Sequence, residues 1–420
     1  MLLVPLAAAA TLQVGSDKTY TTPCAAAAVA ADGDTVEIDA GTYTGDVCAW
    51  TASNLTIRAV GTGYAKLDAD GQASGGKAIW VIQGDDTSIS GIEFTGATVP
   101  DQNGAGIRQE GTNLTVDSCW FHDNEDGILA GDDADSSIVI THSVFDHNGY
   151  GDGQSHNLYI NHVKSLTFAY NWTHHSNVGH QLKSRAYETW VVSNVIEDGD
   201  GGNGSYQVDL PNGGTAVILG NVIGQDPAAE NSGLVSFAAE GATNPTQALY
   251  VVNNTFVNDR GSGTFVRNAS KATAVLTNNL FVGGGTVLDG PGTETTDLET
   301  DASTFVGADD YRLADGSPAI DAGTDPGALD GASLWPDYVP GTSGEEPRPV
   351  VGAIDIGAYE WGTAPETDDT GETEHDSGPG GDDTGAGGGG GGSDGACGCG
   401  GKGAWMLLPA GFLLRRRRVR

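Results

Sequence analysis

Short hydrophobic runs recur along the middle of the chain, and each carries the same three-residue pattern. The pattern is an asparagine or another small residue, a variable residue and, in most copies, a large apolar residue. The copies are Cys119-Trp120-Phe121, Ser143-Val144-Phe145, Asn171-Trp172-Thr173, Asn194-Val195-Ile196, Asn221-Val222-Ile223, Asn254-Thr255-Phe256 and Asn279-Leu280-Phe281, spaced 23 to 33 residues apart. Such a period, with Val, Ile and Thr strands and Gly, Asn and Asp turns, predicts a solenoid of parallel strands. An asparagine at one corner of each coil would bond to its neighbours along the stack.

A second set of inward-facing apolar residues lies one strand earlier in each coil. These residues are Ile107, Ile128, Leu158, Leu182, Val208 and Leu234. Because side chains alternate along a strand, the residues on either side of each should point outward. This register puts Lys183 and Arg185 on one wall, between Tyr159 on the coil before and Asp209 on the coil after. Arg108, Asn157, Gln181 and Gln207 extend this polar wall, and we expect these four residues and Asp209 to bind substrate.

Composition supports an all-β chain and limits the classes of partner that the chain can bind. Glycine accounts for 65 of the 420 residues, and charged residues make up only 18%. A formal net charge of −37 excludes binding to nucleic acid or to anionic lipid surfaces and is compatible with divalent cations. Positive charge is scarce, so Lys183 and Arg185 on one wall predict an anionic ligand such as a uronate polymer. The alternative is a surface ion pair between Lys183 and Asp209, which would contribute little.

The two ends of the chain indicate targeting segments. Residues 1–10 (MLLVPLAAAA) have the apolar stretch of a secretory signal without its basic start, which predicts a signal-peptide remnant and export. Residues 362–396 form a Gly/Asp/Thr-rich linker, and residues 397–420 contain Cys397, Cys399, an apolar run and an arginine cluster. This tail resembles the myxobacterial carboxy-terminal sorting segment (MYXO-CTERM type). The resemblance implies anchoring through Cys397 or Cys399, contact with the membrane only through the tail, and display at the cell surface or outer membrane. The alternative is a disordered tail with a chance apolar patch.

The amino-terminal order of elements resembles a known fold family. Thr22-Pro23 opens a short alanine-rich helix, and the segment 33–38 (GDTVEI) follows as a strand. This order resembles the cap and first coil of right-handed parallel β-helix proteins, the pectate-lyase-like superfamily. Segments 310–313 and 355–360 resemble the closing segment of bacterial β-helices.

This resemblance implies an all-β, single-stranded right-handed parallel β-helix of roughly 9 to 11 coils with an N-terminal helical cap. We expect one domain over residues 20–361, with a closing segment from about residue 300, and a monomer. Cys24 and Cys48 either staple the cap after export or are two free buried thiols.

A run of residues on the predicted wall implies an activity. The segments 156–159, 179–186 and 205–214 resemble a run in bacterial proteins of the pectate-lyase-like group. In the polysaccharide lyases of this fold, a lysine or arginine removes the proton α to a uronate carboxylate, which a cation or Ca²⁺ neutralises. The resemblance implies cleavage of acidic polysaccharide by β-elimination. Lys183 would be the base, its pKa lowered by Arg185, and Arg185 would neutralise the carboxylate. Tyr159 or His180 would serve the leaving oxygen.

The remaining polar residues leave open where a cation would bind. A carboxylate at Asp209 would raise the pKa of Lys183, so the alternative roles of Asp209 are to hold Ca²⁺ or to orient the lysine. Asp198 and Asp200 lie in a loop that is either a Ca²⁺ site or an ordinary polar turn. Ca²⁺ is the one cofactor we consider. His156, His180 and Tyr206 occupy the same position in successive coils, and we expect them to stack at the strand entrance in a structural rather than a catalytic or metal-binding role.

Two other functions remain as alternatives. One is a non-catalytic, adhesin-like surface β-helix that uses the same wall only to bind glycan. The other is a glycoside hydrolase of polygalacturonase-like shape, which would need two carboxylates about 5 to 9.5 Å apart. Asp132 and Asp133 resemble the aspartate pair of polygalacturonases, but Asp209 lies three coils further on, roughly 14 Å away. A deeply lowered pKa of Lys183 would favour the lyase over the glycan-binding protein.

Overall fold

The computed structural model describes residues 9–363, except residues 309, 342–345 and 350. The predicted signal-peptide remnant lies almost entirely outside this range. So do nearly all of the predicted linker and the whole predicted sorting tail, with Cys397 and Cys399. Within the described range, no helix has the length and apolar character needed to cross a membrane.

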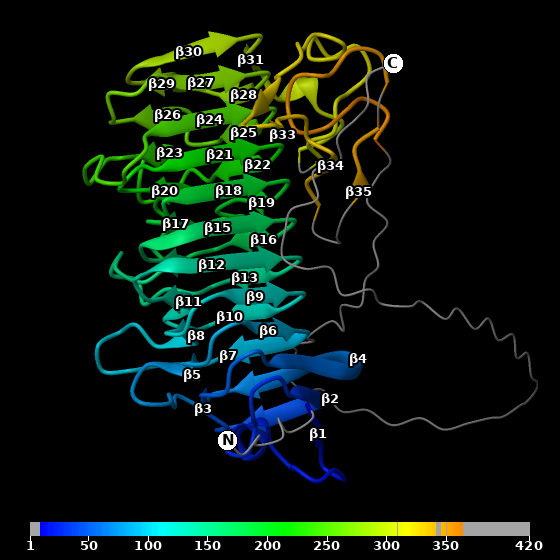
Figure 1. Cartoon of the computed structure of the whole chain (residues 1–420). Helices are drawn as coiled ribbons and strands as arrows, with labels where there is room; N and C mark the ends of the chain where they lie inside the picture. The colour runs from blue at the N-terminus through cyan, green and yellow to red at the C-terminus, as the bar shows by residue number, and fades with distance from the viewer. Residues whose placement is uncertain (1–8, 309, 342–345, 350, 364–420) are drawn as a thin grey trace, which may run out of the picture.

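Parallel strands stack coil upon coil into a solenoid with three faces (Figure 1). A sheet of 21 strands forms two of these faces, and a sheet of 10 strands forms the third. Each strand pairs in parallel with the equivalent strands of the neighbouring coils. The ten-stranded sheet agrees with the predicted number of coils, and the predicted all-β parallel solenoid is confirmed.

The strands of the three faces have the following bounds. The first face contains β1 (Thr11–Val14), β2 (Thr35–Thr44), β4 (Thr56–Asp68), β6 (Thr87–Ser90), β9 (Leu114–Asp117), β12 (Asp133–Thr141), β15 (Val163–Ala169), β18 (Glu188–Val192), β21 (Thr215–Leu219), β24 (Ala248–Val252), β27 (Ala274–Thr277) and β30 (Gly292–Thr295). The second face contains the ends of β2 and β4 (residues 41–44 and 65–68) and the strands β7 (Ile92–Thr95), β10 (Trp120–His122), β13 (Val144–Asp146), β16 (Trp172–His174), β19 (Val195–Ile196), β22 (Val222–Gln225), β25 (Thr255–Asn258), β28 (Leu280–Gly283) and β31 (Leu298–Thr300). The third face contains β3 (Cys48–Trp50), β5 (Ala78–Ile82), β8 (Ala105–Gln109), β11 (Asp126–Ala130), β14 (Leu158–Ile160), β17 (Leu182–Ser184), β20 (Val208–Leu210), β23 (Gly233–Phe237), β26 (Thr264–Asn268) and β29 (Thr286–Asp289).

The interior of the solenoid is filled by apolar side chains in register from coil to coil. The rings of Phe94, Phe121 and Phe145 stack with centroids 4.9 Å apart in each pair, close to the spacing of paired strands. Their burial is complete. Burial of apolar side chains such as these stabilises the fold, because removing one of them from water contributes roughly 1.5 to 3 kcal/mol.

The predicted asparagine stack runs along one corner. Oδ1 of Asn194 accepts the backbone N–H of Asn171 at 2.8 Å, and Oδ1 of Asn221 accepts that of Asn194 at 2.9 Å. The pattern continues through Asn254 and Asn279 and ends at the carboxylate of Asp297. The stack satisfies buried backbone N–H groups at the corners, where strand pairing is interrupted.

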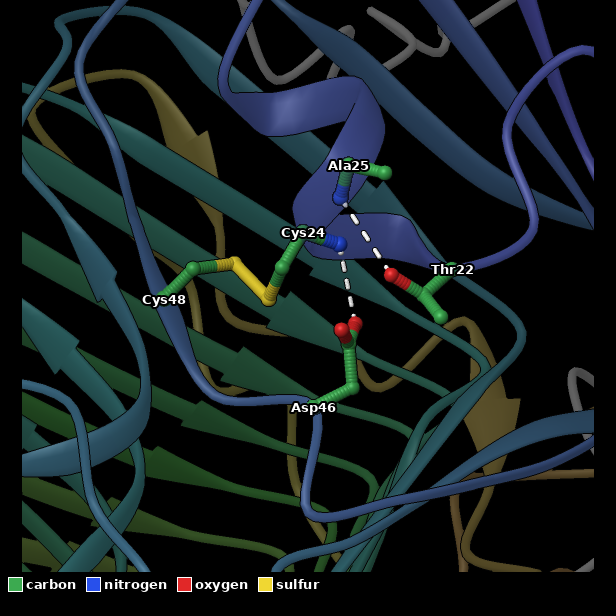
Figure 2. Close-up of a disulfide and its surroundings, with 5 residues drawn as sticks. All are labelled: Thr22, Cys24, Ala25, Asp46 and Cys48. Atoms are coloured by element: carbon green, nitrogen blue, oxygen red, sulfur yellow. Dashed lines mark hydrogen bonds between the residues drawn. A yellow bond between two sulfur atoms is a disulfide. The ribbon is translucent and has the colours of Figure 1, made fainter.

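A short helix and a disulfide close the amino-terminal end (Figure 2). Helix α1 (Pro23–Ala27) begins after Thr22, whose hydroxyl accepts the N–H of Ala25, as the sequence predicts. Cys24 and Cys48 form a disulfide with a Cα–Cα distance of 5.6 Å, so the alternative of two free thiols does not hold in this structure. The solenoid begins earlier than residue 20, because β1 pairs in parallel with β2.

The closing segment folds back along the side of the upper coils (Figure 1). It contains the 3₁₀ helix η1 (Ala302–Thr304) and two short antiparallel pairs, β32 (Ala328–Leu329) with β33 (Ala332–Ser333) and β34 (Tyr338–Val339) with β35 (Glu346–Pro347). Nδ2 of Asn253 donates to the carbonyl of Asp355 at 2.9 Å, and Oγ of Ser193 donates to that of Tyr338 at 2.9 Å. The segment therefore covers corners of the second face instead of extending the stack.

Candidate functional site

The polar wall predicted from the sequence lies on the third face, on strands β14, β17 and β20. Tyr159 pairs in register with Lys183, and Lys183 pairs in register with Asp209. Arg185 directly follows the end of β17. The predicted column continues at Val235, which pairs with Val208, and not at Leu234, because β23 is shifted by one residue relative to the predicted register.

The ammonium group of Lys183 lies between two carboxylates. Nζ is 3.6 Å from Oδ2 of Asp209 and 3.4 Å from Oε1 of Glu240. The same atom lies 5.7 Å from the centre of the Tyr159 ring, within the range of a cation–π contact. The side chain of Lys183 is only 11% exposed, so these contacts define most of its surroundings.

Arg185 holds the other side of the wall. Its Nε donates to the hydroxyl oxygen of Tyr159 at 2.9 Å, and its Nη2 donates to Oε2 of Glu240 at 2.7 Å. Its Nη1 donates to Oδ1 of Asn212. These three hydrogen bonds, one from each guanidinium nitrogen, fix the guanidinium in one orientation.

Glu240 is a member of this site that the sequence reasoning missed. It lies beyond the end of β23, 55 residues after Arg185 and 57 after Lys183, and a backbone N–H···O bond to Pro211 holds its turn. Its carboxylate bridges both cations, although its side chain remains 50% exposed. Glu240 belongs to no repeated motif, so no sequence signal placed it there. The wall therefore already binds one solvent-facing carboxylate through Lys183 and Arg185.

The predicted ring stack at the strand entrance is present and buries His180. The His156 and His180 rings stack with centroids 4.6 Å apart, and Tyr206 follows at 5.4 Å. Nδ1 of His180 accepts the N–H of Tyr206. Burial, together with Lys183 and Arg185, lowers the pKa of His180 to about 3. The ring stays neutral at ordinary pH, and its Nε2 is directed at Oδ2 of Asp209 at 3.6 Å, so these contacts favour the structural role over the catalytic role predicted for His180.

Three of the residues expected to bind substrate lie inside the solenoid. Asn157, Gln181 and Gln207 are fully buried. Nδ2 of Asn157 donates to Oε1 of Gln181 at 2.7 Å and to the carbonyl of His174 at 2.8 Å. Each of these residues stands just before the first residue of its strand, at a corner of the coil, where the alternation of inward and outward side chains does not apply. The predicted outward placement of these three residues is therefore wrong.

Arg108 points along the same column as the wall but stands apart from it. It pairs in register with Leu129, which in turn pairs with Tyr159. Arg108 therefore lies two coils from Tyr159, about 10 Å at the spacing of paired strands. Its nearest carboxylate is Glu110, with Nε 3.9 Å from Oε1. A polymer lying along the solenoid axis would be needed to contact both Arg108 and Arg185.

The predicted Ca²⁺ ligands do not assemble an oxygen cage. Burial raises the pKa of Asp209 to about 6, against the lowering effect of Lys183, and its Oδ2 also lies 3.6 Å from Nε2 of His180. Asp198 is fully buried, and its two oxygens accept from Gln181 and from the backbone of Asp226. Asp198 and Asp200 both line a groove on another face, away from Asp209. Ca²⁺ takes six to eight oxygen ligands, and among the described residues the oxygens of Asp198, Asp200 and Asp209 do not form a converging group, so these residues are not assigned a Ca²⁺ site.

The carboxylates considered for the hydrolase alternative lie on different faces or have other partners. Asp133 begins β12 on the first face, whereas Asp209 lies in β20 on the third face. Asp132 is 3.8 Å from Nδ1 of His162, and Asp133 accepts the hydroxyl of Thr112. Asp133 and Asp209 therefore do not face each other across a bond that could be cleaved.

A groove of about 660 Å³ lies away from the wall, between the second face and the closing segment. Its charged lining is acidic apart from Arg312 and includes Glu197, Asp198, Asp200, Asp226 and Asp310. A polyanion would be repelled there, whereas Lys183 and Arg185 attract one. The wall is therefore the better candidate site.

One family model and one of the solved structures compared agree with this architecture. The family model described as "Right handed beta helix region" matches residues 40–196. The crystal structure of pectate lyase Pel9A is similar at a TM-score of 0.58 and 18% identity, covering 84% of this chain and 96% of that chain. Pectin methylesterase PemA from Erwinia chrysanthemi gives a TM-score of 0.34 at 12% identity, with 73% and 93% covered. The PL6 family alginate lyase AlyGC gives 0.33 at 15% identity, with 73% and 55% covered. No curated protein matches the chain.

The matching family model, the three parallel faces and the likeness to Pel9A agree with one another. The chain is a right-handed parallel β-helix.

Proposed function

We propose that the chain binds uronate-containing polysaccharide on the Lys183 wall and cleaves it by β-elimination. The observation that carries this proposal is that Lys183 and Arg185 converge on one solvent-facing carboxylate, that of Glu240. A uronate carboxylate presents the same two oxygens and would replace Glu240. The name of pectate lyase Pel9A, which shares the fold, agrees with this substrate class.

The proposed reaction assigns one step to each side chain. Arg185 binds the uronate carboxylate and stabilises the negative charge that develops on it. The amine of Lys183 takes the proton from the carbon α to that carboxylate, a carbon–carbon double bond forms, and the bond from the β carbon to the glycosidic oxygen breaks. The Tyr159 hydroxyl, oriented by Arg185 at 2.9 Å, donates its proton to the leaving oxygen. No step uses a metal ion.

Glycan binding without cleavage is the second candidate. A general base must be a neutral amine, whereas the contacts of Lys183 with Asp209 and Glu240 are those of an ion pair. An ion-paired lysine suits recognition of an anionic chain. When substrate displaces Glu240, Lys183 loses one of its two carboxylate partners. The lyase requires this displacement, because fewer carboxylates beside Lys183 favour the neutral amine that a general base needs.

The experiment incubates the purified chain with pectate, alginate and glucuronate-containing glycans and follows the ultraviolet absorbance of the unsaturated product. The variants are Lys183→Met and, as a matched control, Lys164→Met, which removes an exposed lysine outside the wall. We expect absorbance to rise on one polymer for the wild type and Lys164→Met, and to stay flat for Lys183→Met. Retarded migration in a polysaccharide gel with no rise in absorbance would replace the lyase by the glycan-binding protein. No binding and no cleavage on any of these polymers would refute both.

We further propose that the chain is exported. The Cys24–Cys48 disulfide supports this, because structural disulfides persist in oxidising compartments. Mass mapping of the protein from its native source without reduction should recover the two cysteines as one linked peptide pair. Recovery of both cysteines as free thiols would contradict export.

A further inference from the structure

Two neighbouring coils bring an aspartate and two histidines together on the second face, whereas the Lys183 wall lies on the third. Asp146 ends β13 and pairs in register with His174, which ends β16 on the next coil. His147 and His175 follow them directly in the sequence. The solenoid repeat therefore stacks a histidine pair on an aspartate–histidine pair.

The ligand atoms of three of these side chains converge. Nδ1 of His174 lies 3.0 Å from Oδ1 of Asp146 and 2.6 Å from Nδ1 of His175. Nδ1 of His175 lies 4.0 Å from the same oxygen of Asp146. Two imidazole nitrogens and one carboxylate oxygen thus lie within 4.8 Å of one another. In the part of the chain that the structure describes, no other group of three or more such ligands was found.

The local backbone holds His174 and His175 in this arrangement. Consecutive side chains of a strand point to opposite faces, but His175 has a left-handed backbone with φ of 48°, which turns its ring back toward His174. Gly199 leaves room for that ring, because a Cβ at this position would lie 2.1 Å from Cε1 of His175. The carbonyl of His174 accepts Nδ2 of Asn157 at 2.8 Å. The two rings are therefore positioned by contacts from three coils.

The donor set selects a class of ion. Imidazole nitrogen with one carboxylate oxygen suits zinc and its first-row neighbours, whereas Ca²⁺ and Mg²⁺ prefer oxygen ligands alone. The side chains of Asp146, His174 and His175 are 19%, 9% and 27% exposed, so an ion can enter from solvent and keep water as a further ligand. His147 is the nearest additional donor, since its Nδ1 contacts the same carboxylate and its ring stacks on His175 at 4.6 Å.

We propose that Asp146, His174 and His175 bind a divalent transition-metal ion of the zinc type and that the ion clamps two successive coils together. Its ligands come from both coils, so it binds the folded chain and not the unfolded one. Bound metal should therefore raise the stability of the solenoid.

The test uses the full chain without an affinity tag, stripped with EDTA and dialysed. Titration with ZnCl₂ by calorimetry should give one tight site per chain, and one equivalent of Zn²⁺ should raise the melting temperature. Addition of CoCl₂ should give visible absorption bands, and the ring of Trp172, 4.0 Å from that of His174, should lose fluorescence when Cu²⁺ binds. An excess of CaCl₂ should not compete.

Variants separate this site from other groups that bind metal. We expect His175→Gln and the double variant His174→Gln/His175→Gln to weaken Zn²⁺ binding by about 100-fold or more, because loss of even a residue that only orients a ligand costs up to that factor. His142→Gln is the matched control, since it removes a histidine paired with an aspartate, Asp117, at 2.7 Å outside the proposed site. His175 is partly exposed, so His175→Gln should fold even if the double variant does not.

Three results would overturn the proposal. They are no one-to-one binding by the wild-type chain, a Zn²⁺ affinity of folded His175→Gln equal to that of the wild type, and equal losses of affinity in His175→Gln and His142→Gln. The cluster would then be a hydrogen-bonded structural contact between two coils. None of these measurements depends on polysaccharide cleavage.

Discussion

Replacing Glu240 by glutamine should strengthen binding of acidic polysaccharide. Glu240 keeps its carboxylate 3.4 Å from Nζ of Lys183 and 2.7 Å from Nη2 of Arg185, where we propose that a uronate carboxylate binds. Ligand and Glu240 therefore compete for the same two cations. Glutamine keeps the shape of the side chain and an oxygen for the arginine, but removes the charge that the ligand must displace.

The magnitude follows from the exposure of the pair. The Glu240 side chain is 50% exposed, and ion pairs between exposed side chains contribute about 0.2 to 1 kcal/mol. Two such contacts, partly screened by solvent, give a displacement cost of about 1 kcal/mol. Removing that cost should tighten binding about fivefold, since 1.4 kcal/mol corresponds to a factor of ten.

The assay measures affinity for oligogalacturonate and oligoalginate at low and high salt. Glu230→Gln removes an equal charge on the loop before β23, outside the contacts of the wall, and controls for the change in net charge. The gain for Glu240→Gln should exceed the gain for Glu230→Gln and shrink at high salt. Weaker binding by Glu240→Gln would refute the reasoning, because it would mean that Glu240 holds the two cations in place for the ligand.

Three further predictions concern the stability of the solenoid. Asn221→Ala should lower the free energy of unfolding in urea by about 3 kcal/mol, because the N–H of Asn194 loses its buried acceptor and each unsatisfied buried group costs about 1 to 3 kcal/mol. A loss below about 1 kcal/mol would contradict a supporting role for the asparagine stack. Burial raises the pKa of Asp297 from 3.8 to about 7, so the folded chain binds this proton more tightly than the unfolded chain does. The stability that the bound proton provides is therefore present below about pH 4 and is lost as the pH rises to about 7. Asp297→Asn should therefore raise the melting temperature at pH 8 and not at pH 4, and equal effects at both would argue against the raised pKa. Replacing Cys24 and Cys48 by serine should lower the free energy of unfolding by about 3 kcal/mol, as expected for a disulfide that closes a loop over a separation of 24 residues. Urea unfolding that is the same with and without reductant would show that the disulfide does not contribute to stability.

The sequence predicted the stacked architecture because the repeat is local. A large apolar residue such as Phe121 or Phe145 must lie inside the solenoid. In the later copies of the pattern, the asparagine that stands two residues before this position must find hydrogen-bond partners in the next coil. The same logic aligned Tyr159, Lys183 and Asp209 on one wall, since strands of a solenoid pair in register. Helix α1 followed from Thr22 and Pro23, whose capping chemistry is also local.

Tertiary structure decided what the repeat does not encode. The alternation rule failed for Asn157 and Gln181 because they lie at a corner, where the chain turns and the side chains enter the interior. Glu240 joined the wall from a loop whose length is set by no repeat. Asp146 pairs with His174 on the next coil, and the left-handed backbone of His175 brings the second ring to the same point, which no sequence pattern indicated. Strand register can be predicted from a period of apolar residues, whereas loops and corners are placed by contacts between residues far apart in the chain.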